Sequence, residues 1–411
     1  MIEHFFSDPK FFRRCRPGPL GPHIDGFASQ LMHKGYTRYS GQGVIRIVVQ
    51  LNEWLSTKGL TLQELDEHQI DAFRAYRGKR LRSHHGERGT CRLLLHTLRE
   101  AHIIAEAPDE TLNNPRELLV RSYARYLVRE RALSQLTIGH RLPVVREFLS
   151  QRFKSKKLHL KSLRPGDVSR FVLRTMQDQG RDHAQLVTTT LRSFLDFLYQ
   201  QGWLTKPLRA AVPKVANWRH LDLPGFLDPE QVERLLRSCD RSNIGGRRDY
   251  AILLLLARLG LRAHEVRGLT LDDIKWASGE VLIRGKGGRE DRLPVPVDVG
   301  RAVAAYLKRG RPCCACRRVF VRLFAPYEGL TSPTIAAVVE RALARAHISS
   351  THKGAHLLRH SLATHMLRGG ASLTQIGQVL RHQRTETTEI YARIDQQALR
   401  ALAQPWPGGV R

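Results

Sequence analysis

The chain has 411 residues, enough for two or three domains of ordinary size. It carries 67 Lys and Arg against 38 Asp and Glu, a formal net charge of +29. Folding does not need this excess, which favours a polyanionic partner, with the phosphate backbone of nucleic acid as the first candidate. A membrane surface is disfavoured, because the arginines are spread over the whole chain and not gathered on one amphipathic helix or tail.

The apolar runs and the cysteines exclude further classes of protein. The longest clear apolar run is AILLLLA at 251–257, far short of the ~18 residues that span a membrane. The N-terminal segment has no continuous apolar stretch, so we expect no signal peptide. Three cysteines are scattered and three are clustered, which does not make a disulfide framework. We therefore expect a reduced, cytoplasmic protein.

After an N-terminal tail of residues 1–23, the first half of the chain contains an internal repeat. Residues 24–105 and 112–205 each have apolar positions at helical spacing, so we expect two similar helical domains. Neither copy is acidic, so both could rest on DNA; the alternative is that one copy serves only protein contacts. The corresponding positions are Trp54, Leu55, Leu65, Ile70 and Phe73 in the first copy, and Phe148, Leu149, Leu163, Val168 and Phe171 in the second.

A linker at residues 206–225 and a mixed domain at residues 226–411 are expected to follow. The stretch 206–230 is basic and contains four prolines, which argue against a long helix. Asp228 and Pro229 suit the N-cap and first position of a helix. RRDYAILLLLARLGL predicts a buried helix, and EVLIRGKGGREDRLPVPV predicts a β-hairpin. The expected fold class is mainly α with a small antiparallel sheet.

The cluster CCAC, with Cys313, Cys314 and Cys316, has one Cys-x2-Cys spacing, which is half of a zinc site. His347 and His352 are candidate partners, but nothing in the pattern fixes them nearby. The favoured interpretation is a loop before the strand VFVRLFAP, and we expect no metal.

The helix predicted over HLLRHSLATHM gathers positive charge on one face. His356, Arg359 and His360 are spaced i, i+3 and i+4, so they share that face, while the leucines can point into a core. No acidic residue accompanies them. Because like charges on one face repel, this face predicts an anion-binding site.

Three further stretches supply groups suited to such a site. Arg262 follows a Gly-containing turn, with Glu265 three residues later. Lys286 is expected at the tip of the hairpin, within IRGKGGR. His382 is followed nine residues later by Tyr391 in LRHQRTETTEIYARI. Taken singly, each of these residues is more typical of a solvated surface or of ordinary packing.

Together and in this order, the motifs resemble the tyrosine recombinases, the phage integrase family. The matching motifs are Gly-Leu-Arg, Gly-Lys-Gly on a hairpin, His-x-x-Arg-His, and Leu-x-His followed by Tyr. The repeated helical units resemble the core-binding, SAM-like domain of that family, here present twice instead of once. The resemblance implies a recombinase that cleaves and rejoins double-stranded DNA through a 3′-phosphotyrosyl intermediate, with residues 226–411 as its catalytic domain and a mobile element as its context.

The resemblance also implies a role for each residue. Arg262 and Arg359 would hold the non-bridging oxygens of the scissile phosphate, and His382 would donate a third hydrogen bond. Tyr391 would attack phosphorus. A free phenol has a pKa of about 10, so ionising it at pH 7 costs roughly 4 kcal/mol, and attack needs a base. His356 is the base that the resemblance implies.

The remaining roles complete the site. Lys286 would protonate the leaving 5′-oxygen as general acid. Glu265 would orient Arg262 by an ion pair, and His360 would buttress the phosphate site. Because the covalent link conserves the phosphodiester bond energy, the resemblance implies no ATP, Mg²⁺ or other cofactor. One departure is Arg381, which stands where many family members have glycine in Leu-Gly-His; it adds charge and removes no ligand.

Two alternatives share the fold. A DNA-binding accessory protein would not cut DNA, but binding alone has no use for the Tyr391 hydroxyl. A type IB topoisomerase-like enzyme would relax DNA as a monomer, whereas the duplicated helical unit favours assembly on a specific site. The expected partners are DNA, further copies of the chain in a dimer or tetramer on recombination sites, and accessory recombinases, with no membrane.

Overall fold

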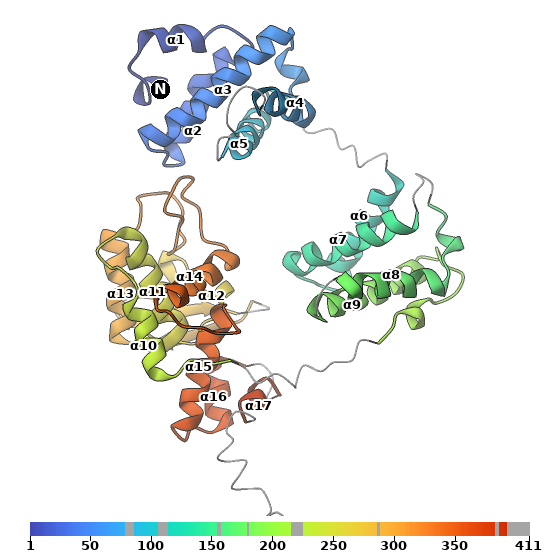
Figure 1. The fold of residues 1–411 in the computed structure, drawn as a ribbon, viewed down its shortest axis with the longest axis vertical. Coiled ribbons are helices and arrows are strands. Elements are labelled where there is room, and N and C mark those ends of the chain that lie inside the picture. The colour runs from blue at the N-terminus through green and yellow to red at the C-terminus, as the bar shows by residue number, and fades with distance from the viewer. Residues whose placement is uncertain are drawn as a thin grey trace, which may run out of the picture. The chain divides into compact units, whose positions relative to one another are not determined.

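The computed structural model describes residues 1–78, 86–105, 114–153, 158–178, 181–214, 225–285, 288–382 and 386–392 (Figure 1). These residues are mostly helical, with one three-stranded antiparallel sheet, which confirms the expected fold class. Two compact units are distinguished: residues 105–219 form one, and residues 1–104 and 220–411 belong to the other. Over the described ranges, every helix is too short or too polar to cross a membrane.

The described part of residues 1–104 forms a bundle of five α-helices around one core. The longest, α3, begins after Thr37, whose side chain accepts a hydrogen bond from the Ser40 amide, and ends at Gly59 in the left-handed conformation. Its apolar face carries Trp54 and Leu55 into the core. The helices are α1 (Pro9–Cys15), α2 (Ile24–His33), α3 (Arg38–Lys58), α4 (Glu67–Gly78) and α5 (Glu87–Glu100).

The first 23 residues differ from the tail that the sequence led us to expect. Phe5 and Leu20 are fully buried in the core of this first bundle. The buried Asn52 side chain on α3 accepts a hydrogen bond from the Leu20 amide at 2.8 Å and donates one to the Pro17 carbonyl. Phe5 directly follows the short 3-10 helix Ile2–His4, and Leu20 directly precedes the 3-10 helix Gly21–His23, so no helical periodicity indicates their burial.

The second bundle has four helices, which are α6 (Pro115–Arg129), α7 (Gln135–Arg152), α8 (Pro165–Asp178) and α9 (Arg181–Gln200). Phe148 and Leu149 of α7 are buried here, as Trp54 and Leu55 are in the first bundle. Leu208 and Val212, from the expected linker, also join this core, so the bundle extends beyond residue 205. Residues 215–224 of the linker lie outside the described residues.

The C-terminal part is built around α11, whose residues Ala251–Ala257 are all buried. Strands β1, β2 and β3 pair antiparallel in that order, with Val281 opposite Leu293 and Arg284 opposite Glu290. Figure 1 shows these elements in yellow to red. The helices are α10 (Pro229–Arg237), α11 (Ile244–Arg258), α12 (Ala263–Gly268), α13 (Val297–Arg309), α14 (Ser332–Arg345), α15 (Ala355–Arg368), α16 (Leu373–Leu380) and α17 (Glu386–Ala392), and the strands are β1 (Ile274–Lys275), β2 (Glu280–Arg284) and β3 (Glu290–Pro294).

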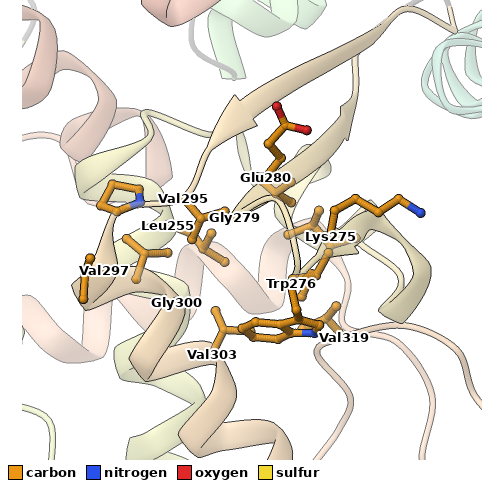
Figure 2. A pocket seen from close by; sticks show the side chains of 15 residues that line it. Leu255, Lys275, Trp276, Gly279, Glu280, Val295, Val297, Gly300, Val303 and Val319 are labelled. Atoms are coloured by element: carbon orange, nitrogen blue, oxygen red, sulfur yellow. The ribbon is translucent and has the colours of Figure 1, made fainter.

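A small apolar hollow of about 100 Å³ lies beside the sheet and α13 (Figure 2). Trp276, which is 52% exposed, and Val303 and Val319 are among the side chains that line it. The lining is almost entirely apolar and lacks the convergent cationic groups that would hold an anion. The charged site predicted from the sequence therefore lies elsewhere in this part of the chain.

We predict that Phe5→Ala destabilises the first bundle by about 3–5 kcal/mol, because a fully buried ring that packs directly on Gly41 leaves a cavity. Hydrogen exchange of the α3 amides in the whole chain measures this local stability. Tyr39→Ala is the control, since that side chain is 88% exposed. Unchanged exchange in Phe5→Ala would show that the N-terminal segment does not support the bundle.

Candidate active site

Arg359 lies at the centre of the charged site. It is only 2% exposed on α15, a helix whose Leu357 and Leu358 are buried in the core. Its guanidinium donates one hydrogen bond to the Gly260 carbonyl and another to the Leu380 carbonyl. Because a guanidinium has five N–H groups, others remain for a ligand. Arg359 thus joins α15 to the turn after α11 and to the end of α16.

The turn at Gly260 requires glycine. Its φ is +58°, in the left-handed region, and a Cβ there would lie 2.7 Å from Leu380 and 3.0 Å from Leu362. This close approach lets the Gly260 carbonyl reach Arg359 and places Arg262 at the start of α12. The Gly-Leu-Arg motif is therefore a geometric requirement of the site.

Glu265 holds Arg262 as the sequence led us to expect. Its carboxylate accepts a hydrogen bond from the Arg262 backbone amide at 2.8 Å and one from Arg262 Nη1 at 2.9 Å. Arg381 Nη2 lies 3.0 Å from the same carboxylate. Burial opposes ionisation, but the Arg262 amide and the charges of Arg381 and Arg262 lower the pKa of Glu265 below its ordinary value. Glu265 is therefore a buried carboxylate shared by two arginines.

Tyr391 lies beside these groups in the same chain. It is 1% exposed on α17 and packs with Ile376 and Leu380. Its Oη is 2.9 Å from His360 Nδ1. Burial raises the pKa of Tyr391 above its ordinary value, while the charges of Arg359 and Arg262 act in the opposite direction.

The three histidines take different positions around Tyr391. His360 makes the hydrogen bond to the phenol, whereas the His356 ring lies 6.1 Å from the His360 ring, centroid to centroid. The expected base, His356, is thus not the histidine in contact with Tyr391 among the described residues. The sequence places both histidines on one helical face. Only the position of α17 determines which of them contacts Tyr391. His382 stacks on the Tyr391 ring at 6.3 Å, and its Nδ1 is 2.7 Å from Thr388 Oγ1.

Burial keeps these imidazoles neutral. It lowers the pKa of His360 to about 4, helped by the nearby His356 and Arg359. It lowers the pKa of His382 to about 4 as well, helped by the charges of Arg359 and Arg262. The pKa of His356 is also lowered by burial and by Arg359. At pH 7 a neutral His360 can accept a proton from the phenol.

A cavity of about 790 Å³ opens beside Arg262, Arg381 and His382. Gly285 and Arg289, which flank the tip of the hairpin, line the same cavity. Lys286 itself lies outside the described residues. Its neighbours nevertheless bring the hairpin to the cavity that holds the arginines.

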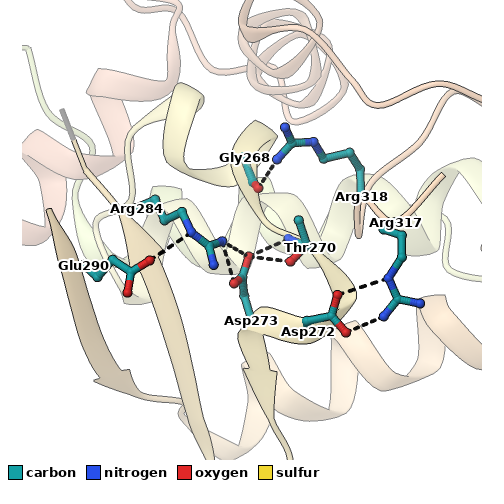
Figure 3. Close-up of polar contacts among 8 residues, drawn as sticks. All are labelled: Gly268, Thr270, Asp272, Asp273, Arg284, Glu290, Arg317 and Arg318. Carbon is teal, nitrogen blue, oxygen red and sulfur yellow. Dashed lines mark hydrogen bonds and ion pairs between the residues drawn. The ribbon is translucent and has the colours of Figure 1, made fainter. Parts of the chain in front are cut away.

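A buried carboxylate fixes the base of this hairpin (Figure 3). Asp273, 1% exposed, accepts hydrogen bonds from the Thr270 amide and hydroxyl, both at 2.8 Å, and from Arg284 Nη1 at 2.6 and 2.7 Å. Arg284 also donates from Nε to Glu290, its cross-strand partner, at 3.2 Å. Sequence reasoning missed Asp273, because an acidic residue in a turn is commonplace.

The clustered cysteines carry free thiols: Cys313 is exposed, and Cys314 and Cys316 are half-buried. Across the described parts of the chain, no group of three or more His, Cys, Asp or Glu side chains is placed to hold a metal ion.

Comparisons with known proteins agree with this geometry. Residues 225–398 match the phage integrase family, and residues 120–202 match the N-terminal SAM-like domain of phage integrases. The chain is 44% identical to a protein of Sinorhizobium fredii described as an integrase/recombinase, y4rA, over 99% of both chains. The chain belongs to the phage integrase family of tyrosine recombinases. It is also 30% identical to the tyrosine recombinase XerC of Oceanobacillus iheyensis, over 70% of this chain and 95% of that protein.

Solved structures share the fold of this recombinase. The XerH site-specific recombinase in its post-cleavage complex with a palindromic difH substrate has a TM-score of 0.56 at 19% identity, covering 74% of this chain and 98% of that one. A lambda integrase dimer bound to a core site has a TM-score of 0.51 at 15% identity, covering 71% and 98%. The y4rA match extends along nearly the whole recombinase and so includes the first helical bundle.

We predict that His360 and His382 titrate far below an ordinary imidazole in the DNA-free protein. Because burial lowers each pKa to about 4, both rings stay neutral as the pH falls from 8 to 5. An unperturbed imidazole, with a pKa of about 6.5, would be mostly protonated at pH 5. Carbon-13 NMR of labelled histidines measures this, with signals assigned from His360→Gln and His382→Gln. A midpoint near 6.5 for His360 would contradict the assignment of a neutral base.

Proposed function

We propose that this recombinase cleaves and rejoins double-stranded DNA through a 3′-phosphotyrosyl bond to Tyr391, as the integrase or transposase of a mobile element. The observation that carries the proposal is the hydrogen bond between Tyr391 Oη and a neutral His360 beside the buried Arg359. A nucleophile, a proton acceptor and an anion-binding cation thus meet in one chain. The net charge of +29 supports DNA as the substrate.

The proposed reaction begins with binding of the scissile phosphate between Arg262 and Arg359. Their planar donor groups hold its non-bridging oxygens, and His382 adds a hydrogen bond. The Tyr391 proton passes to His360 Nδ1 as the phenol oxygen bonds to phosphorus. The bond from phosphorus to the 5′-oxygen breaks, and Lys286 protonates that oxygen. Attack by a 5′-hydroxyl from a second strand reverses these steps and releases Tyr391.

Two features of the site suit it to respond to DNA. A bound phosphate places negative charge beside Arg359, one of the groups that depress the pKa of His360, so DNA binding would make His360 a stronger base. Tyr391 is buried and is not among the residues that line the cavity, so α17 must shift for its oxygen to reach phosphorus.

Strand exchange needs two DNA sites, so we propose that the recombinase acts as a homo-oligomer, a dimer or tetramer on paired sites, with accessory recombinases as further partners. Tyr391 contacts His360 of its own chain, which favours cleavage in cis. Integrase and recombinase complexes with DNA share the fold, which supports the same substrate here.

We predict that Tyr391→Phe abolishes cleavage while folding and DNA binding survive, because only the hydroxyl is removed and the ring keeps its packing. A binding site is first selected from a pool of random DNA duplexes by its affinity for the wild-type chain. The substrate is a duplex that contains this site and a nick. Covalent protein–DNA adduct is measured on a denaturing gel, and affinity by fluorescence anisotropy. Adduct formed by Tyr391→Phe would exclude Tyr391 as the nucleophile. Wild-type binding without adduct would favour a non-cleaving accessory protein.

We predict that Lys286→Ala lowers the rate of cleavage of the normal substrate by about 10²–10⁴-fold, as expected when a general acid is removed. A 5′-bridging phosphorothiolate should restore it, because a thiolate leaves without a proton. Arg359→Ala is the matched comparison, since it removes charge stabilisation and leaves the acid in place. Equal rescue of both variants, or no rescue of Lys286→Ala, would overturn the role of Lys286.

A further inference from the structure

Arg381 occupies a backbone position that favours glycine. It is the C-cap of α16, with φ of 55° and ψ of 48°, in the left-handed region that side chains with a Cβ rarely adopt. A residue other than glycine keeps this strained backbone conformation only where the surrounding contacts hold it in place. Such positions cluster at functional sites. The Arg381 side chain is therefore the feature that needs an explanation.

That side chain turns into the site. It is 7% exposed, its Nη2 lies 3.0 Å from Glu265, and its Nη1 donates to the Val379 carbonyl at 3.2 Å. Its Nε is buried and has no hydrogen-bond partner among the described residues. Arg381 also lines the cavity with Arg262 and His382. A buried, charged donor without a partner beside a cavity indicates a ligand that accepts hydrogen bonds.

The contacts of the arginines favour an anion as the ligand, although Asp291 and Glu389 also line the cavity. Glu265 is the only carboxylate within salt-bridge distance of Arg381 or Arg262 among the described residues, and both arginines share it. Arg359 adds a third guanidinium whose described partners are carbonyls. Burial and the charges of Arg262 and Arg381 lower the pKa of Arg359 to about 9, so the three cations repel one another. Arg359 and the Arg381 side chain are nearly buried, at 2% and 7% exposure, and the Arg262 side chain is 26% exposed. An anion beside them would relieve this repulsion.

We propose that Arg381 binds the scissile phosphate as a third arginine, through its free Nε–H and beside Arg262 and Arg359. The inference rests on the proposed function, since it needs a phosphodiester in this cavity. Arg381 has a second effect through Glu265. Because Arg381 also pairs with this carboxylate, the ion pair between Glu265 and Arg262 is weaker, and the Arg262 guanidinium can bind the phosphate more strongly. The charge of the phosphate grows as Tyr391 attacks, so a third guanidinium acts most strongly in the transition state.

The competing explanation is that Arg381 only neutralises Glu265 and so positions Arg262. Removal of the Arg262 side chain separates the two, and removal of the phosphate charge tests whether either acts on that charge. A methylphosphonate replaces one non-bridging oxygen with a methyl group and removes the negative charge. A residue that acts on this charge, directly or through Arg262, loses its importance with the methylphosphonate. The Arg381 variants are therefore also made in an Arg262→Ala chain. There a residue that only positions Arg262 has no further effect, whereas a residue that binds the phosphate itself still slows adduct formation when it is removed.

The test uses Arg381→Gly and Arg381→Asn, which remove the charge and accept the left-handed backbone, so folding is expected to survive. Arg381→Lys keeps the charge on a different geometry. The control is Arg317→Ala, since Arg317 is an exposed partner of Asp272 and is not among the residues that line the cavity. Single-turnover adduct formation is measured for each variant on the nicked phosphate duplex and on the same duplex with a methylphosphonate at the scissile position.

On the phosphate, we expect Arg381→Gly and Arg381→Asn to slow adduct formation by about 10²-fold, as for loss of one preorganised donor. On the methylphosphonate, the loss should shrink to less than about threefold, and Arg381→Lys should fall between these variants and the wild type on the phosphate. The Arg317→Ala control should react like the wild type on both. An equal loss on both substrates, no loss on the phosphate, or no further loss in the Arg262→Ala chain would overturn this inference alone. Failure of the wild type to form any adduct would overturn the proposed function and this inference with it.

Discussion

The site depends on one buried guanidinium. Arg359 donates to the Gly260 carbonyl, two residues before Arg262, and to the Leu380 carbonyl, directly before Arg381. Three segments that are distant in sequence are thereby held around one cation. The burial that fixes this geometry also removes water from the charge, so an anion that enters is bound in a medium of low dielectric constant. The buried position of Arg359 thus both stabilises the fold and suits its guanidinium to bind a phosphate.

The electrostatics of the site explain why its histidines are neutral and why its buried carboxylate is ionised. His360 and His382 stay uncharged at pH 7 because burial and the surrounding arginines oppose protonation. Glu265 is buried, and it remains ionised because Arg262 and Arg381 contact it. The result is a group of three guanidiniums around one shared carboxylate, with a proton acceptor against the phenol of Tyr391. A phosphodiester would place its negative charge beside these guanidiniums, and phosphoryl transfer to a tyrosine would use the acceptor.

The sequence predicted the class of fold and named most residues of the candidate site, and it failed where burial lacks a periodic signal. Long periodic helices such as α3 and α11 were expected from their apolar spacing, whereas Phe5 and Leu20 sit in short turns and were assigned to a tail. The motifs placed Arg262 and Arg359 in one site. They could not decide between His356 and His360, because one helical face presents both and the contact depends on α17.

The most direct test of this account is to identify the residue that becomes linked to DNA. The wild-type recombinase is trapped on the nicked duplex, digested with trypsin and nuclease, and the nucleotide-bearing peptide is sequenced by mass spectrometry. The account predicts a single adduct, with the 3′-phosphate of the cleaved strand on the Tyr391 oxygen. An adduct on another residue, or one formed through a 5′-phosphate, would contradict it.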